Sequence, residues 1–180
     1  MRIIAGNHRG RRIRVPKNLP VRPTTDRAKE ALFSILNHKI DFSSAQVLDL
    51  YSGTGSIGFE FCSRGCPSVI AVDANQACAL FIENISKDLN LPIQSIRMTA
   101  KEYLRKCLSR FDVIFADPPY DKGTEEFEHI IGLIETRKLL RPNGWLIFEH
   151  TEQADFSAEH AYKESRKYGS CVFSFFQFPD

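Results

Sequence analysis

The chain has 180 residues, of which 43% are hydrophobic and 26% charged, a composition typical of one soluble globular domain. It has no apolar run near the roughly 18 residues of a membrane span and no apolar signal segment at its start, so we expect a cytoplasmic protein without membrane contact. The cysteines lack paired CxxC spacing, so we expect reduced thiols and no metal site; they are Cys62, Cys66, Cys78, Cys107 and Cys171.

The net charge of +2 is distributed unevenly along the chain. Residues 1–30 hold nine Lys or Arg and two acidic residues, a net charge of +7, whereas the other 150 residues hold fifteen basic and twenty acidic ones, a net charge of −5. This asymmetry indicates a polyanionic partner, although a basic segment that is merely solvated would have the same composition. The arginines expected to contact such a partner are Arg9, Arg11, Arg12, Arg14, Arg22 and Arg27.

The N-terminal segment predicts a basic β-hairpin followed by a helix. Residues 3–6 and 12–15 are strand-like and flank residues 7–10, which are rich in turn formers. Three prolines then interrupt the chain, and a helix is expected after the N-cap types at residues 24–26. We therefore divide the chain into a hairpin and linker at 1–24, an extension that would contact the polyanionic partner, and a main domain at 25–180.

From residue 46 onward strands alternate with helices. Strands are expected at 46–51, 68–73, 93–97, 111–116 and 145–150, and helices at 56–64, 75–89, 100–108 and 124–139. Two further strand-like stretches, 162–167 and 171–178, suggest a terminal antiparallel hairpin around Gly169. This order predicts an α/β fold with a doubly wound parallel sheet, whose ligands bind beyond the carboxyl ends of the strands. Those ends carry residues 49–55, Asp73, Thr99, residues 117–120, Glu149 and His150.

A glycine-rich turn marks the expected cofactor end. Residues 53–58, GTGSIG, fit the G-x-G-x-x-G pattern between a strand and a helix, but this pattern alone does not separate NAD from S-adenosylmethionine. Asp73 ends the next strand, where a carboxylate can accept hydrogen bonds from ribose hydroxyls. Asp49 suits a cationic amino group better than a pyrophosphate, which favours S-adenosylmethionine. Alternatively, Asp49 caps the loop and Asp73 forms a turn. The expected cofactor residues are Asp49, Tyr51, Ser52, Gly53, Gly55, Asp73, Thr99, Ala100 and Asp117.

The tetrapeptide at residues 117–120, Asp-Pro-Pro-Tyr, marks the expected substrate end. The Asp117 carboxylate and the Pro118 carbonyl are acceptors suited to the two hydrogens of an –NH2 group, and Tyr120 can stack on a base for about 1–3 kcal/mol. The lone pair of a base amino nitrogen is conjugated into the ring, so acceptors at both hydrogens could direct it toward a methyl donor. The alternative for the two prolines is a simple end to the strand. We expect Asp117, Pro118 and Tyr120 to be catalytic.

Several segments together resemble a known family. They are residues 2–6, 9–11, 22–27, 49–55 and 117–120, and they resemble the bacterial 16S rRNA guanine-N2 methyltransferases of the RsmD family over almost the whole chain. Residues 22–27 are the family-specific part. The resemblance implies a class I S-adenosylmethionine-dependent methyltransferase with a Rossmann-like, seven-stranded, mostly parallel sheet. It also implies N2-methylation of one guanine in 16S rRNA of the 30S subunit or its assembly intermediate, with RNA held by the basic hairpin. We expect a monomer.

One position departs from the commoner methyltransferase pattern. After the third strand an acidic residue often reaches the adenine amino group, whereas this chain has Thr99 and Ala100, so Thr99 or a backbone amide would replace that contact.

Two other functions would fit parts of the sequence. A DNA adenine or cytosine amino methyltransferase would use the same tetrapeptide, but no separate DNA-recognition domain is evident. A non-catalytic RNA-binding assembly factor would not need the intact glycines and tetrapeptide.

Overall fold

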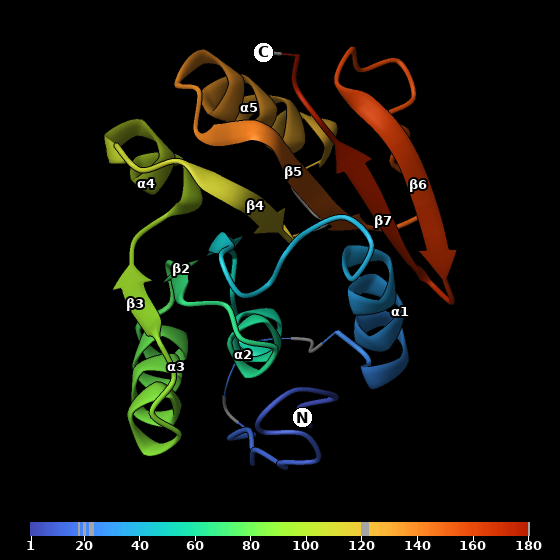
Figure 1. The fold of residues 1–180 in the computed structure, drawn as a ribbon. Helices are drawn as coiled ribbons and strands as arrows, with labels where there is room; N and C mark the ends of the chain where they lie inside the picture. The colour runs from blue at the N-terminus through green and yellow to red at the C-terminus, as the bar shows by residue number, and fades with distance from the viewer. Residues whose placement is uncertain (18, 20, 22–23, 120–122, 180) are drawn as a thin grey trace.

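The structure, a computed structural model, describes residues 1–17, 19, 21, 24–119 and 123–179. Strands and helices alternate over most of the chain, as the sequence predicts (Figure 1). The elements are α1 (Asp26–Leu36), β1 (Gln46–Leu50), α2 (Ser56–Ser63), β2 (Ser68–Asp73), α3 (Gln76–Asp88), β3 (Ile93–Arg97), α4 (Ala100–Lys106), β4 (Phe111–Ala116), α5 (Gly123–Thr136), β5 (Leu140–His150), β6 (Tyr162–Tyr168) and β7 (Cys171–Phe176).

The strands form a seven-stranded sheet in the order β3-β2-β1-β4-β5-β7-β6. The first five strands are parallel, and β7 is antiparallel to both β5 and β6. The prediction of a doubly wound, mostly parallel sheet with a terminal antiparallel hairpin is confirmed. The strand order reverses between β1 and β4, and in open sheets of this kind ligands bind beside such a reversal.

Helices cover both faces of the sheet, with α1 and α2 on one side and α4 and α5 on the other (Figure 1). Successive strand residues point to opposite faces. Val47, Phe115 and Ile147 therefore pack in the core beneath α1 and α2. Their neighbours in the chain, among them Leu48 and Phe148, pack in the core beneath α4 and α5. The central strands are apolar on both faces because both faces are covered.

Strand β5 and helix α5 differ most from their predicted bounds. β5 begins at Leu140 rather than at 145, because Leu140 pairs with Phe111 ahead of an irregularity in the ladder. The intervening Pro-Asn-Gly sequence looks like a turn, and Asn143 does take a left-handed φ of 62° within the strand. α5 ends at Thr136 rather than at 139, since Lys138 leaves the helical region with φ 51°.

The N-terminal residues 1–13 fold back on themselves, as the predicted hairpin requires. Backbone hydrogen bonds join Ile3 N to Arg11 O at 3.0 Å, Gly10 N to Ile3 O at 2.9 Å, and Ile13 N to Met1 O at 3.0 Å. The pairing is short, with a single antiparallel bridge between Arg2 and Arg12 in place of two regular strands. The hairpin lies beside α2, at the blue end of the chain in Figure 1.

Helix α2 holds this hairpin through two polar side chains. The buried Glu60 carboxylate accepts the backbone N–H groups of Ile4 and Ala5 at 2.7 and 3.0 Å. The Ser63 hydroxyl donates to Ala5 O at 2.5 Å. Gly6 passes so close that a Cβ there would lie 1.8 Å from Ser63 O, and its φ of +80° also favours glycine. The hairpin is therefore packed onto the sheet domain.

One basic residue of the N-terminal segment serves this packing. Lys29 of α1 is 1% exposed, and its ammonium donates to Arg2 O at 2.6 Å and to the Ser56 hydroxyl at 3.0 Å. Burial lowers its pKa, while the nearby charge of Glu60 opposes that effect. Because it is enclosed, Lys29 does not add to the basic surface that the composition of residues 1–30 suggests.

No described helix is both long enough and apolar enough to cross a bilayer. Across the same residues, no group of three or more His, Cys, Asp or Glu side chains is placed to hold a metal ion.

Candidate active site

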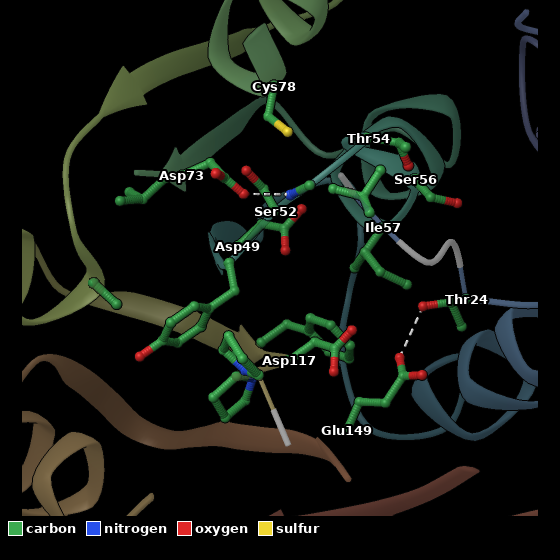
Figure 2. A pocket seen from close by; sticks show the side chains of 18 of the residues that line it. Thr24, Asp49, Ser52, Thr54, Ser56, Ile57, Asp73, Cys78, Asp117 and Glu149 are labelled. Atoms are coloured by element: carbon green, nitrogen blue, oxygen red, sulfur yellow. Dashed lines mark hydrogen bonds between the residues drawn. The ribbon is translucent and has the colours of Figure 1, made fainter. Parts of the chain in front are cut away.

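A cavity of about 1110 Å³ lies at the carboxyl ends of β1, β2 and β4 and extends to the end of β5 (Figure 2). The start of α1 and the turn between β6 and β7 complete its wall. It brings together all but one of the residues predicted to bind a cofactor, namely Asp49, Tyr51, Ser52, Gly53, Asp73, Thr99, Ala100 and Asp117. The exception is Gly55, which lies behind the loop as the N-cap of α2.

The glycine-rich turn is shaped by backbone conformation and by Asp73. Gly53 and Gly55 both have positive φ, and a Cβ at Gly55 would lie 2.8 Å from Ile82 Cγ1. One Asp73 oxygen accepts Gly53 N at 2.7 Å (Figure 2). The other accepts Asn75 N at 2.8 Å. Asp73 thus has the turn-forming role considered above. Since each carboxylate oxygen has two lone pairs, it can also accept ligand hydroxyls.

Asp49 is a buried carboxylate at the centre of this end of the sheet. It is 1% exposed and accepts Gly58 N at 3.1 Å, so it also caps the loop. Burial raises its pKa to about 8, and the negative charges of Asp73 and Glu149 contribute to the shift. A buried carboxylate is stabilised by a cation or by hydrogen bonds. A cationic ligand in the cavity would supply the positive partner that the Asp49 carboxylate lacks among the groups named here.

Two further carboxylates share the face of Asp49. In the register of β1 and β4, Asp49 pairs with Phe115, two residues before Asp117 on the same face. In the register of β4 and β5, Ala116 pairs with Phe148, so the next residue of each, Asp117 and Glu149, lie side by side. Burial raises the pKa of Asp117 well above its ordinary range, and the charges of Glu149 and Asp49 add to the effect. Three mutually repelling carboxylates make this part of the cavity favourable for positive charge.

Ser52 provides an independent sign of a ligand. Its hydroxyl oxygen is buried in the cavity wall and has no hydrogen-bond partner among the described residues. An unsatisfied buried polar group costs about 1–3 kcal/mol, which a bound ligand would recover. S-adenosylmethionine carries a sulfonium, an ammonium and two ribose hydroxyls. The acidic cavity, the glycine turn and the unsatisfied Ser52 hydroxyl fit that molecule.

Thr99 and Ala100 line the wall where the adenine contact was expected. Thr99 is the N-cap of α4; its hydroxyl donates to the Glu102 carboxylate at 2.6 Å and accepts Glu102 N at 3.2 Å. Its own N–H donates to the same carboxylate at 3.2 Å. The capping box therefore occupies both polar groups of Thr99 that could have replaced the missing acidic residue.

The predicted substrate and RNA residues are only partly described. Asp117 and the buried Pro118 line the cavity, while Tyr120 and Arg22 lie outside the described residues. Arg27 is exposed and lines the cavity near the start of α1. The hairpin arginines are exposed and do not line this cavity; they are Arg9, Arg11, Arg12 and Arg14. Arg12 and Arg14 line a second hollow of about 600 Å³.

The structure adds site residues to which the sequence assigned no role. Glu149, 5% exposed, accepts a hydrogen bond from the Thr24 hydroxyl at 2.8 Å (Figure 2). The Tyr51 hydroxyl donates to Glu126 of α5 at 2.5 Å, and Lys101 pairs with the same carboxylate at 2.6 Å. Glu149 belongs to no motif. Aligning the ends of the fourth and fifth predicted strands, at residues 116 and 150, would have placed it within two residues of the position opposite Asp117, and the observed register supplies the remaining shift.

This sheet order, with a glycine turn after β1, an acidic residue ending β2 and a carboxylate-lined cavity, defines a class I S-adenosylmethionine-dependent methyltransferase. The family described as conserved hypothetical protein 95 matches residues 1–177. The chain is 33% identical over 150 residues to ribosomal RNA small subunit methyltransferase D of Escherichia coli strain K12, covering 83% of this chain and 71% of that protein. The chain therefore belongs to this family, the RsmD family, as its resemblance predicts.

Solved structures show the same fold. The yhhF protein of Escherichia coli superposes with a TM-score of 0.84 at 26% identity, covering 98% of this chain and 97% of that one. A 16S rRNA N2 G1207 methyltransferase, RsmC of Thermus thermophilus, was solved with AdoMet and guanosine. It superposes with a TM-score of 0.69 at 21% identity, covering 86% of this chain and 43% of RsmC, and this likeness shows the fold alone.

Proposed function

We propose that this chain transfers a methyl group from S-adenosylmethionine to the exocyclic N2 amine of a specific guanine in 16S rRNA of the small ribosomal subunit. One observation carries the proposal: Asp117 and Pro118 line the same cavity as Asp49, Ser52 and the glycine turn. An amino group held at the first two residues would face a methyl donor held by the others. Family membership supports an rRNA substrate, since the relative from Escherichia coli is named for the small subunit.

The residues around the glycine turn would hold the methyl donor. The Asp49 carboxylate would attract the ammonium, and Asp73 would accept ribose hydroxyls in addition to its two backbone N–H groups. The Ser52 hydroxyl would gain the partner that it lacks among the described residues. Tyr51, Thr99 and Ala100 would form the wall of the adenine site. The polar contact for adenine would be the N–H of Ala100 in the first turn of α4, because the hydroxyl and N–H of Thr99 already bond to Glu102 in the capping box.

At the substrate end, Asp117 and Pro118 would each accept one hydrogen of the guanine N2 amine. S-adenosylmethionine supplies an electrophilic methyl group on its sulfonium. N2 would take that methyl group from the sulfur and would give up one proton to the Asp117 carboxylate or to water. Burial raises the pKa of Asp117 above its ordinary range, which makes this carboxylate a better proton acceptor. Tyr120 is proposed to stack on the base.

RNA would bind across the exposed arginines of the hairpin and at Arg27 beside the cavity. Arg9, Arg11, Arg12 and Arg14 form no ion pair within the described part of the chain, so their charges are available to phosphates. We propose residues 1–24, including Arg22, as the RNA-binding extension and residues 25–180 as the methyltransferase domain. The protein would act as a cytoplasmic monomer on the 30S subunit or its assembly intermediate.

The direct test is methyl transfer from labelled S-adenosylmethionine to 30S particles that lack the modification. Nuclease digestion and mass spectrometry should then find N2-methylguanosine at one mapped position of 16S rRNA. Protein-free 16S rRNA and duplex DNA serve as comparison substrates. The proposal fails if no N2-methylguanosine forms, and activity on duplex DNA above that on 30S particles would favour a DNA methyltransferase instead.

A further inference from the structure

Glu149 lies where a third acceptor for the substrate base is needed. It is the penultimate residue of β5 and lies beside Asp117 on the same face of the sheet, and both side chains line the cavity (Figure 2). Neighbouring strands are about 4.8 Å apart, so the two carboxylates can contact adjacent atoms of one ligand. The Thr24 hydroxyl and the Cys171 thiol contact the Glu149 carboxylate. A carboxylate has about four lone-pair sites and can accept several hydrogen bonds at once, so a base N–H can bond to Glu149 in addition to such contacts.

The hydrogen-bonding edge of guanine differs from those of adenine and cytosine beside the amino group. In guanine the ring nitrogen next to the amine, N1, carries a hydrogen and is a donor. In adenine and cytosine the corresponding ring nitrogen is an acceptor. Asp117 and Pro118 are assigned to the two amino hydrogens, so the guanine N1–H requires one more acceptor next to Asp117.

We propose that Glu149 accepts the N1–H of the substrate guanine and so selects guanine over bases whose amine adjoins an unprotonated ring nitrogen. This inference rests on the proposed function, because it assumes that the amine held by Asp117 and Pro118 is guanine N2. A carboxylate facing a ring acceptor is repelled by it, whereas an N1–H forms a charge-assisted hydrogen bond. Bonds of that kind correspond to about a 10- to 100-fold preference.

The test uses 30S particles in which the mapped guanosine is replaced by 2-aminopurine ribonucleoside. This base keeps the 2-amino group, but its N1 is an acceptor. Single-turnover methyl transfer by the wild-type protein should favour guanosine by about 10- to 100-fold. Glu149→Gln should lower the guanosine rate by a similar factor. It should also bring the preference close to one, because the glutamine N–H can donate to the 2-aminopurine N1.

Glu126→Gln is the matched control. Glu126 is also a buried carboxylate of the same cavity, but it lies on α5 and bonds to Tyr51 and Lys101. Whatever this variant does to the rate, the preference for guanosine should stay at the wild-type value. The thermal midpoint and the S-adenosylmethionine affinity of Glu149→Gln, measured alongside, show whether the fold and the cofactor end are intact.

Three outcomes separate the inference from the function on which it rests. If the wild type methylates both bases at the same rate, N1–H is not recognised and the inference is wrong; this arm needs no variant to fold. If Glu149→Gln slows both substrates equally, Glu149 acts in proton transfer or positioning rather than in base selection. If the wild type modifies neither base, the proposed function itself fails.

Discussion

Glu60 and Asp49 are both buried carboxylates on the α1/α2 side of the sheet, with 0% and 1% exposure, but their surroundings differ. Glu60 accepts two backbone N–H groups of the hairpin and the Arg64 guanidinium at 2.9 Å. Asp49 accepts one N–H, from Gly58, and faces further negative charge. The charge of Glu60 is satisfied within the chain and supports the fold. The charge of Asp49 is satisfied only in part, which is what a binding site for a cation requires.

The largest effect is expected on stability when Glu60 is removed. Glu60→Ala would leave Arg64 and the Ile4 and Ala5 N–H groups without their acceptor and should cost about 3–5 kcal/mol of unfolding free energy. Urea denaturation followed by circular dichroism measures it. Glu83→Ala removes an exposed carboxylate that pairs with Lys87 and should cost about 0.5 kcal/mol or less. A Glu60→Ala loss as small as that of Glu83→Ala would contradict the structural role of Glu60.

Asp117→Ala should lower turnover by about 100- to 1000-fold, the usual effect of losing a transition-state acceptor. The affinity for S-adenosylmethionine should change far less, because Asp117 is assigned mainly to the substrate amine. Single-turnover rates on 30S particles and calorimetry with S-adenosylmethionine give the two quantities separately. Equal losses in rate and affinity would place Asp117 with the cofactor rather than with the substrate.

Asp49→Asn should stabilise the folded chain while lowering its affinity for S-adenosylmethionine. The pKa of Asp49 is raised to about 8 in the folded chain, above its ordinary value near 3.9, so its ionisation destabilises the folded state as pH rises from about 4 to about 8. Asparagine can still accept the Gly58 N–H but carries no charge. Without cofactor, the variant should gain a few degrees in thermal midpoint at pH 8.5 and little at pH 5.

The same variant should bind S-adenosylmethionine about 10-fold or more weakly, since the attraction between opposite charges is lost. Calorimetry checks the affinity, and differential scanning fluorimetry at the two pH values checks stability. Unchanged affinity, or a lower thermal midpoint at pH 8.5, would mean that Asp49 is a structural cap alone.

The smallest effect is expected for the hairpin surface. Replacing Arg9, Arg11 and Arg12 by Gln should reduce the slope of log binding constant against log salt for 16S rRNA by about 2 to 3, one phosphate contact each. Filter binding at several salt concentrations measures it. The control replaces three exposed basic residues elsewhere, namely Lys106, Arg110 and Lys138, and should leave the slope unchanged. An unchanged slope in the hairpin variant would remove the hairpin from the RNA interface.

The sequence predicts the central sheet well because its strands are apolar on both faces and alternate with amphipathic helices. β2, β3 and β4 lie at the predicted residues. The start of β5 escapes prediction because Pro142, Asn143 and Gly144 have the local preferences of a turn, and only pairing with β4 keeps that segment extended. Local patterns do not encode this long-range pairing.

The site residues likewise divide into those set by local sequence patterns and those set by long-range contacts. The glycine turn and Asp73 are predictable because their spacing reflects local backbone geometry. Glu60 accepts hydrogen bonds from Ile4 and Ala5, which precede it by 56 and 55 positions, and Lys29 bonds to Ser56, which follows it by 27 positions. The structural roles of Glu60 and Lys29 therefore could not be assigned from their neighbours in the sequence. Glu149 falls between these cases, since its position at a strand end is local but its closeness to Asp117 depends on the register between β4 and β5.

Helix α2 has a further consequence for how the protein would approach its substrate. Gly55 caps its first turn beneath the cofactor loop, while Glu60 and Ser63 near its last turn hold the hairpin. All eight residues are buried, and a helix of eight residues is about 12 Å long. This short, enclosed helix would act as a fixed spacer between the proposed cofactor end and the hairpin proposed to bind RNA. It would hold the hairpin arginines and a bound methyl donor at a constant separation, so that an RNA would be selected by the distance between its target base and its phosphates.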